Sequence, residues 1–572
     1  MSPSRRRKAP TPLLSISPPS YAVLVLLLTS AFLLGLATDF SFLPRFHWPD
    51  FAAHKDLKPS YEFPDFNKVI HFRTLSARDA GLDDPSRRLL VIGDVHGMNG
   101  SLHDLLAAAS WNSNTDTLMF AGDIMAKSSH SGSLAVLDFI TRHECGSAPG
   151  RVHAVRGNHD QMVTQWRAWR DWFEPLELQL LSSSVPPPSS DTRPGPPVHT
   201  GRAFLDLIES EWEYAQKHDP KGSSDPEEWA DIARKRAAGT WRSEWWRRVP
   251  RSGKGHANKD FIIFADHYWI AKDMSQAQRE CLYSMPLVLH VPSDHFFVVH
   301  AGLLPSDPKR PLMDKRQPLA HPPHLISEST DGRTRDYDEI SAYHPPASQR
   351  ALTVRPESLP IRNRTSEKLR TAQEIAILTD IADNRDPWAL LNMRGVRKSG
   401  KVTRRNDKGK PWSKLWNNQI KRCGGFDTWS ESEDADSDVL SLPCEPATVV
   451  YGHAATRGLD IKRWSMGVDT GCLYGRQLTA LVLQRKSSNP EALPGDHLGD
   501  DDDEEEEEEY GGGDDDDDER RGIRGSSSLN SQKPKRKPKM GRVQFGDDDS
   551  RIDARIVSVE CPDGADADTD FD

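Results

Sequence analysis

The stretch VIGDVHGMNG, from Val91 to Gly100, combines the end of an apolar run with two polar side chains two positions apart. The run from Arg88 to Gly93 is rich in branched residues and predicts a β-strand. Side chains at positions i and i+2 of an extended segment point the same way, so Asp94 and His96 are expected to converge beyond the strand end. An acid and an imidazole that converge in this way indicate a metal ion as their common target.

The rest of the chain supplies the elements that a strand of this kind needs as neighbours. The segment NGSLHDLLAAASW, starting at Asn99, has apolar residues at helical spacing. Five further apolar runs are predicted to be strands: Leu118 to Ala121, Val152 to Arg156, Phe261 to Ala265, Phe296 to Val299 and Thr448 to Tyr451. Strand, helix and strand in succession predict an α/β fold.

Each of five motifs follows one of these apolar runs, and each carries residues suited to metal or phosphate chemistry. They are GDVHG at Gly93, GDIMAKS at Gly122, RGNHD at Arg156, VVHAG at Val298 and YGHAATRG at Tyr451. A single Gly-Asp or Asn-His is an ordinary turn dipeptide. Five such motifs in series at strand ends are not explained by turns, and they predict one shared site.

The residue types in these motifs fit two metal ions held about 3.5–4 Å apart, an arrangement that grips the attacking and leaving oxygens at phosphorus. The predicted ligands are Asp94, His96 and His300 or His453 as terminal ligands, Asp123 as a bridge and Asn158 as an amide oxygen. Mixed nitrogen and oxygen ligands favour zinc, manganese or iron over magnesium or calcium. Three other histidines compete for the second metal, although a histidine near a strand is more often structural: His267, His290 and His295.

The motif series resembles that of the calcineurin-like metallophosphoesterases, which include the protein serine/threonine phosphatases and carry GDxHG, GDxxDRG, GNHE, HGG and a late histidine. The resemblance implies a sandwich of two mixed β-sheets flanked by helices. It assigns one metal to Asp94, His96 and Asp123, and the other to Asp123, Asn158, His300 and His453. It further implies that His159 is the general acid for the leaving oxygen.

The chain departs from the family at one motif, because Ala126-Lys127-Ser128 stands where the phosphatases have Asp-Arg-Gly. The family aspartate orients the catalytic histidine, so the sequence does not identify the group that holds His159. Lys127 would offer phosphate a point charge in place of the arginine fork. Arg156 and Arg457 are the candidates for further phosphate contacts, and a structural role for each arginine is an equal alternative.

The chain ends and insertions surround one large catalytic region. Tyr21 to Thr38 is an uncharged 18-residue stretch preceded by Arg5-Arg6-Arg7-Lys8, which predicts a transmembrane signal anchor with a cytosolic tail; a cleaved signal peptide is the alternative. The predicted organisation is a tail at 1–20, a membrane span at 21–38, a stalk at 39–85, and a catalytic domain at 86–487. Insertions are expected near 182–255 and 304–368, and the first of them is expected to be partly helical. After the catalytic domain, we expect a disordered acidic and basic loop at 488–552, followed by a last strand and a tail at 553–572.

The acidic block governs the charge of the whole chain. The formal net charge is -11, and Asp500 to Glu519 contains 16 acidic and no basic residues, which leaves +5 elsewhere. Gln477 to Gln484 before the block and Arg555 to Cys561 after it alternate like strands, and we expect them to pair and make the block a loop. The six cysteines contain no C-x-x-C pair; Cys423 and Cys444 form either a disulfide or two structural thiols.

Within the superfamily, GDIMAKS, DPWALLNMRGV and the stretch from Tyr451 to Leu483, together with the predicted anchor, resemble the fungal vacuolar zinc-dependent endopolyphosphatases. The GVDTGCLYG part of that stretch is also similar to the symmetrical diadenosine tetraphosphate hydrolases. The first of these resemblances implies a single-pass protein of the vacuole membrane whose luminal domain cleaves inorganic polyphosphate by metal-hydroxide attack. The alternatives are a serine/threonine phosphoprotein phosphatase, a dinucleoside polyphosphate hydrolase and a catalytically silent membrane-tethered scaffold. The predicted partners are a phosphorylated substrate and the membrane, with no nucleic acid.

Overall fold

A computed structural model describes residues 63–66, 68–145, 151–178, 199–218, 226–250, 262–323, 361–428, 441–486, 539–547 and 550–562. Two six-stranded mixed sheets dominate these residues. The predicted membrane span and the acidic block lie outside them. Of the predicted stalk, 39–85, the last part is described and supplies β1 (Ile70–Thr74) to the second large sheet, with Leu75 and Leu82 buried, so this part is not a stalk. Among the described residues, no helix combines the length and apolar character needed to cross a membrane.

The first large sheet contains the strand of the opening motif. Its order is β16 (Lys539–Val543), β17 (Ile552–Glu560), β15 (Gln477–Arg485), β2 (Arg88–Ile92), β3 (Thr117–Phe120) and β4 (Val152–Ala154). Strands β2, β3 and β4 are mutually parallel, whereas β15 runs antiparallel to both β2 and β17. The carboxyl ends of β2, β3 and β4 therefore meet at one edge.

The second large sheet has a similar arrangement. Its order is β1 (Ile70–Thr74), β7 (Pro286–Val291), β8 (Phe296–Val299), β12 (Thr448–Tyr451), β14 (Ser465–Gly467) and β13 (Asp460–Lys462). Strands β8, β12 and β14 are parallel. Two small ribbons complete the sheets: β5 (Glu177–Leu178) with β6 (His199–Thr200), and β9 (Gly395–Val396) with β10 (Val402–Thr403) and β11 (Lys410–Pro411).

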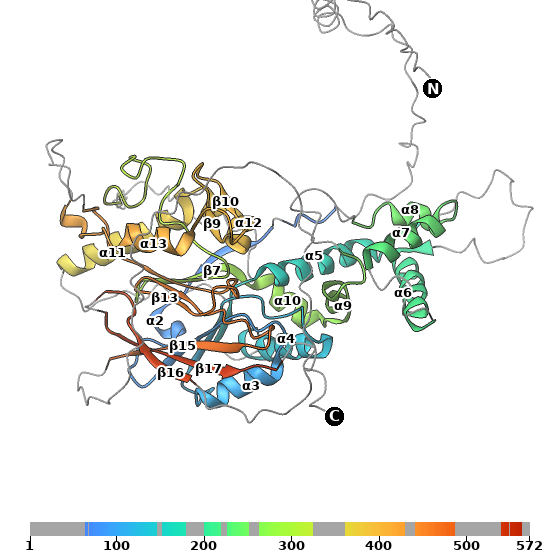
Figure 1. Cartoon of the computed structure of the whole chain (residues 1–572), viewed down its shortest axis with the longest axis horizontal. Helices are drawn as coiled ribbons and strands as arrows, with labels where there is room; N and C mark the ends of the chain where they lie inside the picture. The colour runs from blue at the N-terminus through green and yellow to red at the C-terminus, as the bar shows by residue number, and fades with distance from the viewer. Residues whose placement is uncertain are drawn as a thin grey trace, which may run out of the picture. The chain divides into compact units, whose positions relative to one another are not determined.

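Both faces of the central strands of each large sheet are buried, which explains their continuous apolar runs. Leu89 and Val91 of β2 pack between the two sheets, whereas Leu90 and Ile92 of the same strand pack under helices. The helices over the first sheet are α3 (Asn99–Ala108), α4 (His130–Glu144), α5 (Asn158–Phe173), α9 (Asp266–Asp273) and α10 (Gln276–Ser284). The second sheet is covered by α11 (Ile361–Asp380), α12 (Pro387–Asn392) and α13 (Trp412–Ile420), so the layers run helix, sheet, sheet, helix (Figure 1). The predicted α/β sandwich is confirmed.

The remaining helices are short or belong to the first insertion. They are α2 (Ala77–Ala80), α6 (Gly201–His218), α7 (Pro226–Ala237), α8 (Arg242–Trp246) and the 3₁₀ turns η3 (Asp383–Arg385) and η4 (Phe426–Thr428). The helical prediction for the insertion is confirmed by α6, α7 and α8.

The strand predicted at Phe261 to Ala265 is wrong. Residues 262–265 form a turn that leads into α9, and Phe264 has a φ of 65°. Ile263 and Phe264 are buried, but the aromatic rings of Trp212 and Trp229 surround Phe264 in place of a neighbouring strand. A short apolar run signals burial and does not by itself distinguish a strand from a packed turn.

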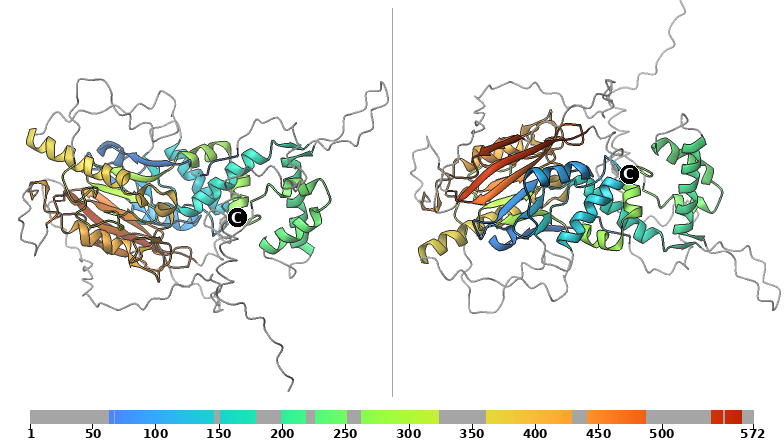
Figure 2. Two further views of the ribbon diagram at one scale, coloured as in Figure 1. Left: turned by 90° about the horizontal axis from the view of Figure 1, so that it is seen from above. Right: turned by 90° about the horizontal axis from the view of Figure 1, so that it is seen from below.

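The strand pair around the acidic block is confirmed, since β15 and β17 pair over nine residues from Gln477–Glu560 to Arg485–Ile552. These long strands lie side by side in Figure 2. A strand that the sequence reasoning missed, β16, adds to the outer edge of β17. The acidic block therefore connects strands of one sheet.

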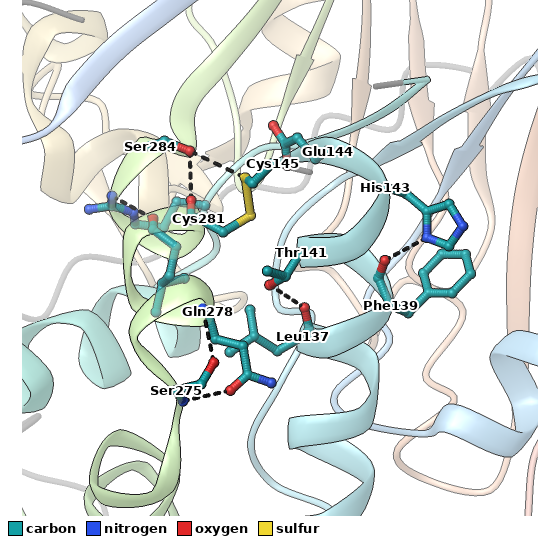
Figure 3. Close-up of a disulfide and its surroundings, with 12 residues drawn as sticks. Leu137, Phe139, Thr141, His143, Glu144, Cys145, Ser275, Gln278, Cys281 and Ser284 are labelled. Atoms are coloured by element: carbon teal, nitrogen blue, oxygen red, sulfur yellow. Dashed lines mark hydrogen bonds between the residues drawn. A yellow bond between two sulfur atoms is a disulfide. The ribbon is translucent and has the colours of Figure 1, made fainter. Parts of the chain in front are cut away.

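All six cysteines form disulfides. Cys423–Cys444 closes the loop predicted as one of two alternatives, and Cys472–Cys561 joins the segment before β15 to the residue after β17. Cys145–Cys281 links the end of α4 to α10, next to Glu144 and Ser284 (Figure 3). The last two pairings were not predicted, because partners 136 and 89 residues apart cannot be matched by spacing alone.

Candidate metal centre

Residues from three parallel strands of the first sheet meet at the edge where these strands end. Asp94 follows β2, Asp123 follows β3, and Asn158 follows β4 as the first residue of α5. The parallel register of the strands is what brings carboxylates 29 positions apart along the chain to one place.

The second sheet also contributes side chains that follow the ends of parallel strands. His300 follows β8, His453 lies two residues after β12, and Asp469 lies two residues after β14. Their strands are parallel, so these side chains share an edge, and that edge faces the ends of β2 and β3.

Two groups of potential ligand atoms form at this junction and share Asp123. Asp94, His96 and Asp123 have ligand atoms within 4.8 Å of one another, and so do Asp123, His300 and His453. Oδ2 of Asp123 lies 3.7 Å from Nε2 of His96 and 3.4 Å from Nε2 of His300. Oδ1 of Asn158 lies 3.0 Å from the same nitrogen of His300. The structure thus brings together all six predicted ligands in two overlapping groups.

Backbone contacts fix the orientation of these side chains. The N–H of His453 donates to both oxygens of Asp94 at 3.1 and 3.0 Å, and Nδ1 of His300 lies 2.9 Å from the carbonyl oxygen of Ala121. Gly452 allows this approach, because a Cβ there would lie 2.0 Å from Oδ1 of Asp94. The glycine before His453 is therefore part of the site's geometry.

The loops that carry the site hold unusual backbone conformations. Eight non-glycine residues with positive φ occur in the described ranges, and four of them line the cavity: His96, Asp123, Lys127 and His453. Each such conformation costs about 1–3 kcal/mol and persists only where surrounding contacts enforce it. Their concentration here marks these loops as functional.

The three carboxylates of the cluster differ in their electrostatics. Against the effect of burial, His300 and His159 hold the pKa of Asp123 well below its usual range, whereas Asp94 and Asp469 are shifted upward. Burial raises the pKa of Asp94 well above its usual range, and the neighbouring Asp469 and Asp123 carboxylates raise it further. Burial likewise raises the pKa of Asp469 and lowers that of His453. Three buried carboxylates in one small cavity need positive charge close by.

The donor set fits divalent metal ions. Nε2 of His453 and Nδ1 of His96 are buried and have no hydrogen-bond partner among the described residues. Buried imidazole nitrogens are normally paired, and neutral imidazole with carboxylate is the set that zinc, manganese and iron accept. Asp94 and Asp123 supply the carboxylates, and Asn158 supplies an amide oxygen.

The other predicted site residues fall into two groups. His159 and Lys127 line a cavity of about 100 Å³ together with the ligand set. Arg156 does not: its side chain is buried at 2% exposure, and its guanidinium donates to Gln161 and to the carbonyls of Leu282 and Tyr283. The predicted phosphate contact of Arg156 is therefore wrong, since these acceptors use its donors in the core.

Arg457 also does not line the cavity, but it contacts a residue that does. Its guanidinium donates to the carbonyl oxygen of Arg394 at 2.6 Å, while the Arg394 side chain lies in the wall of the cavity and donates to the carbonyl oxygen of His453. The role of Arg457 toward phosphate stays a prediction.

Sequence reasoning missed three residues of the site, Asp469, Arg394 and Asp266, and considered a fourth, His267, only as a competing metal ligand. Asp469 and Arg394 line the cavity, and Asp266 and His267 lie directly behind His159. Asp469 had a usable signal, because Val-Asp-Thr-Gly follows an apolar run as the other motifs do. Arg394 and Asp266 had none, since their place at the site depends on packing between segments that lie far apart along the chain.

Residues 87–268 match the model of the calcineurin-like phosphoesterase family. The fold and the ligand set described above agree with that match, and the chain contains a calcineurin-like metallophosphoesterase domain. This class consists of metal-dependent phosphoester hydrolases that use two divalent metal ions.

Curated relatives match a short part of the chain. The symmetrical bis(5'-nucleosyl)-tetraphosphatases of Vibrio cholerae and Pectobacterium carotovorum are 40% and 44% identical over 70 residues, which is 12% of this chain and 23% and 22% of those proteins. The chain thus spans less than a quarter of the length of these relatives.

Two solved structures are also similar. The crystal structure of a candidate diadenosine tetraphosphatase is 18% identical, with a TM-score of 0.29, covering 72% of this chain and 94% of that one. A serine/threonine phosphatase from Saccharomyces cerevisiae is 14% identical, with a TM-score of 0.18, covering 44% and 47%. TM-scores this low support no conclusion about this chain.

Proposed function

We propose that this protein is a two-metal phosphohydrolase that cleaves inorganic polyphosphate at internal bonds of the polymer. The observation that carries the proposal is the pair of overlapping ligand groups that share Asp123 inside a cavity also lined by His159, Lys127 and Arg394. Two bound dications would supply Lewis-acid activation of water and neutralise charge on phosphate.

The residues of the chain have separate roles in this proposal. Asp94, His96 and Asp123 hold one metal, and Asp123, Asn158, His300 and His453 hold the other. Lys127 and Arg394 attract the phosphate chain, because with two dications they outweigh the three carboxylates of the cavity. His159 faces the same cavity and donates the proton that the departing phosphate chain requires.

Dinucleoside polyphosphate hydrolysis is a second candidate with its own support. The matched curated relatives are tetraphosphatases of this type. Tyr474 lies on the cavity wall with 63% of its side chain exposed, and an exposed aromatic ring can stack on a nucleobase. Both substrates are phosphoanhydrides, so the same metal chemistry serves either.

A single set of incubations separates the candidates. The purified full-length chain, supplied in turn with zinc, manganese and iron, is given long polyphosphate, a diadenosine tetraphosphate and a phosphopeptide. Intermediate-length polyphosphate on a gel supports the proposal, and orthophosphate alone indicates cutting from the ends. Turnover confined to the dinucleotide or to the phosphopeptide overturns it, as does a complete lack of turnover, which is the result expected of a scaffold.

The proposal includes an anchored, luminal location in the vacuole membrane. Three disulfides that use every cysteine support an oxidising compartment, because cytosolic thiols are kept reduced. Residues 21–38 would provide the anchor. Protease protection of the catalytic domain in sealed vacuoles, lost when detergent is added, is the expected result; digestion without detergent would contradict a luminal domain.

A further inference from the structure

Behind the general-acid candidate lies a chain of three hydrogen-bonded side chains. Nδ1 of His159 is 2.8 Å from Nε2 of His267, and Nδ1 of His267 is 2.7 Å from Oδ1 of Asp266. The two imidazole planes are inclined by 17°. His159 opens α5, whereas the other two residues open α9, 108 positions later.

The direction of these hydrogen bonds follows from the carboxylate at the end of the chain. Despite its burial, Asp266 keeps a pKa below its usual range, because His267 and the backbone N–H of Lys127 donate to it. An ionised carboxylate only accepts, so Nδ1 of His267 carries a proton, and in the neutral ring of His267 the lone pair is then on Nε2. That lone pair accepts from His159, which fixes the proton of neutral His159 on Nδ1.

The consequence for His159 is that Nδ1 is occupied and Nε2 is the nitrogen left for chemistry. His159 lines the cavity beside the ligand groups, and its own backbone N–H donates to Oδ1 of Asp123 at 2.9 Å. Ala126, where the family resemblance places an aspartate, is fully buried and has no polar side-chain atom. No hydrogen bond within the described residues joins Ala126's side chain to His159.

We propose that His267 and Asp266 form a positioning pair that holds His159 in its Nδ1–H form with Nε2 directed into the cavity. This inference rests on the proposed hydrolysis of phosphate compounds. His159 enters the step as the imidazolium, with a proton on each nitrogen. Water adds its oxygen to phosphorus, the bond to the leaving oxygen breaks with its electron pair, and that oxygen takes the proton from Nε2 of His159, which leaves the Nδ1–H form. The proton released by the water restores the imidazolium.

The backbone contact of Asp266 gives the pair a second attachment. Oδ2 of Asp266 accepts from the N–H of Lys127 at 2.6 Å, so one carboxylate orients His267 and also holds the loop that follows β3. Lys127 has a φ of 74° and Ala126 a φ of 71°. Asp266→Asn is therefore a poorer test than a change at His267, because it alters the loop as well.

The kinetic test compares His267→Ala with His267→Gln and Asp273→Asn. Glutamine keeps an acceptor for His159, and Asp273 forms a 3.0 Å pair with His130 at the other end of α9, which makes Asp273→Asn a matched control. Substrates are phenyl phosphate, with a poor leaving group, and p-nitrophenyl phosphate, with a good one. We expect His267→Ala to lower kcat for phenyl phosphate about 10–100-fold, the loss typical when a residue that orients a functional group through a hydrogen bond is removed. KM and the bound metals stay unchanged, the loss is smaller for p-nitrophenyl phosphate, and glutamine restores part of it.

A double variant separates positioning from simple structural support. If His267 acts through His159, then His159→Ala combined with His267→Ala is no slower than His159→Ala alone. Additive losses, equal losses for both leaving groups, or loss of metal from His267→Ala would each overturn the inference. An unchanged rate in His267→Ala would also overturn it.

A measurement without turnover keeps the test independent of substrate and of mutant folding. In metal-free wild-type protein, ¹⁵N ring spectra assigned with His159→Gln should show His159 as the Nδ1–H tautomer; the Nε2–H tautomer would overturn the inference. Cleavage of aryl phosphates without cleavage of polyphosphate would defeat the proposed function and leave this inference standing.

Discussion

Among the described residues, the metal centre and a second cluster of buried histidines and carboxylates are built on opposite principles. In the metal centre, Asp94, Asp123 and Asp469 crowd together, and His453 has a ring nitrogen without a partner among the described residues. In the other cluster, Glu374 of α11 lies between two imidazoles. Its oxygens are 2.7 Å from Nε2 of His290 and 2.9 Å from Nδ1 of His295.

In the second cluster, each ring nitrogen of His290 and His295 already has a protein partner, so neither histidine has a nitrogen left for a ligand. The remaining nitrogen of His290 lies 3.3 Å from the hydroxyl of Thr74, and that of His295 lies 3.4 Å from Glu367. The cluster ties α11 to the second sheet. The comparison teaches that a group of histidines and carboxylates indicates a binding site only where some of its hydrogen-bonding atoms have no protein partner.

The largest expected effect is the loss of activity in Asp123→Asn. The shared carboxylate touches both ligand groups, and metal stabilisation of the transition state is worth several kcal/mol, roughly a thousandfold in kcat. We expect that loss together with reduced metal content by elemental analysis. Glu374→Gln is the control and should keep its metals and its activity. Unaltered turnover in Asp123→Asn would show that the metal centre and the Glu374 cluster do not differ in function as described.

A matched pair of substitutions should give opposite results in the two clusters. His290→Gln removes the partner of a fully buried carboxylate and should cost about 3–5 kcal/mol of unfolding free energy, with both metals retained. His453→Gln should lose metal and leave the stability of the metal-free protein nearly unchanged. Denaturant unfolding and metal analysis of both variants test this, and the reverse pattern would exchange the roles of the clusters.

Metal removal should act on one cluster alone. Ligands that bind only the folded state at about 100 times their Kd stabilise it by roughly 2.7 kcal/mol. A chelator should therefore lower the Tm of the wild-type protein and of His295→Gln alike, and leave the Tm of Asp123→Asn almost unmoved. A chelator-sensitive Tm in Asp123→Asn would show that the metal binds elsewhere.

The sequence predicted the ligand set because each ligand follows directly from an apolar strand of the parallel core. Asp94, Asp123 and His453 are fixed by strands whose two buried faces leave no other register. Apolar runs alone do not distinguish His300 from His290, and the family motif favoured His300. The antiparallel direction of β7 against β8 places His290 at the far edge.

What the sequence could not provide are the contacts between helices that lie far apart along the chain. His267 was considered as a metal ligand, and Arg156 as a phosphate contact, because both are polar residues beside apolar runs. His267 lies on α9 and contacts His159, whereas the guanidinium of Arg156 donates to the carbonyl oxygen of Leu282 in α10. Both outcomes depend on packing between distant helices, which carries no local signal.

The smallest expected effect is a pH dependence of the structural cluster. Glu367 and Glu374 raise the pKa of His295 against the opposing effect of burial. The contribution of His295 to folding stability is therefore present at low pH and is lost as pH rises through the pKa of His295 in the folded protein. His290 and His295 lower the pKa of Glu374 against its burial, so that contribution is lost as pH falls below about 4.5. His295→Gln should therefore cost most near pH 5–6, by about 1–2 kcal/mol, and less at pH 9. A cost independent of pH, measured by denaturant unfolding, would show that the pair is not ionic.

The bridge between Cys472 and Cys561 has a practical consequence for anyone who purifies this protein. It spans the junction where β15 and β17 pair, and the whole connection from 487 to 538 lies between its two ends. A protease that nicks the chain anywhere in that connection would yield two polypeptides still joined by sulfur and by nine paired residues. The cut would be invisible on a gel until a reductant is added, and an intact band without reductant is no proof of an intact chain.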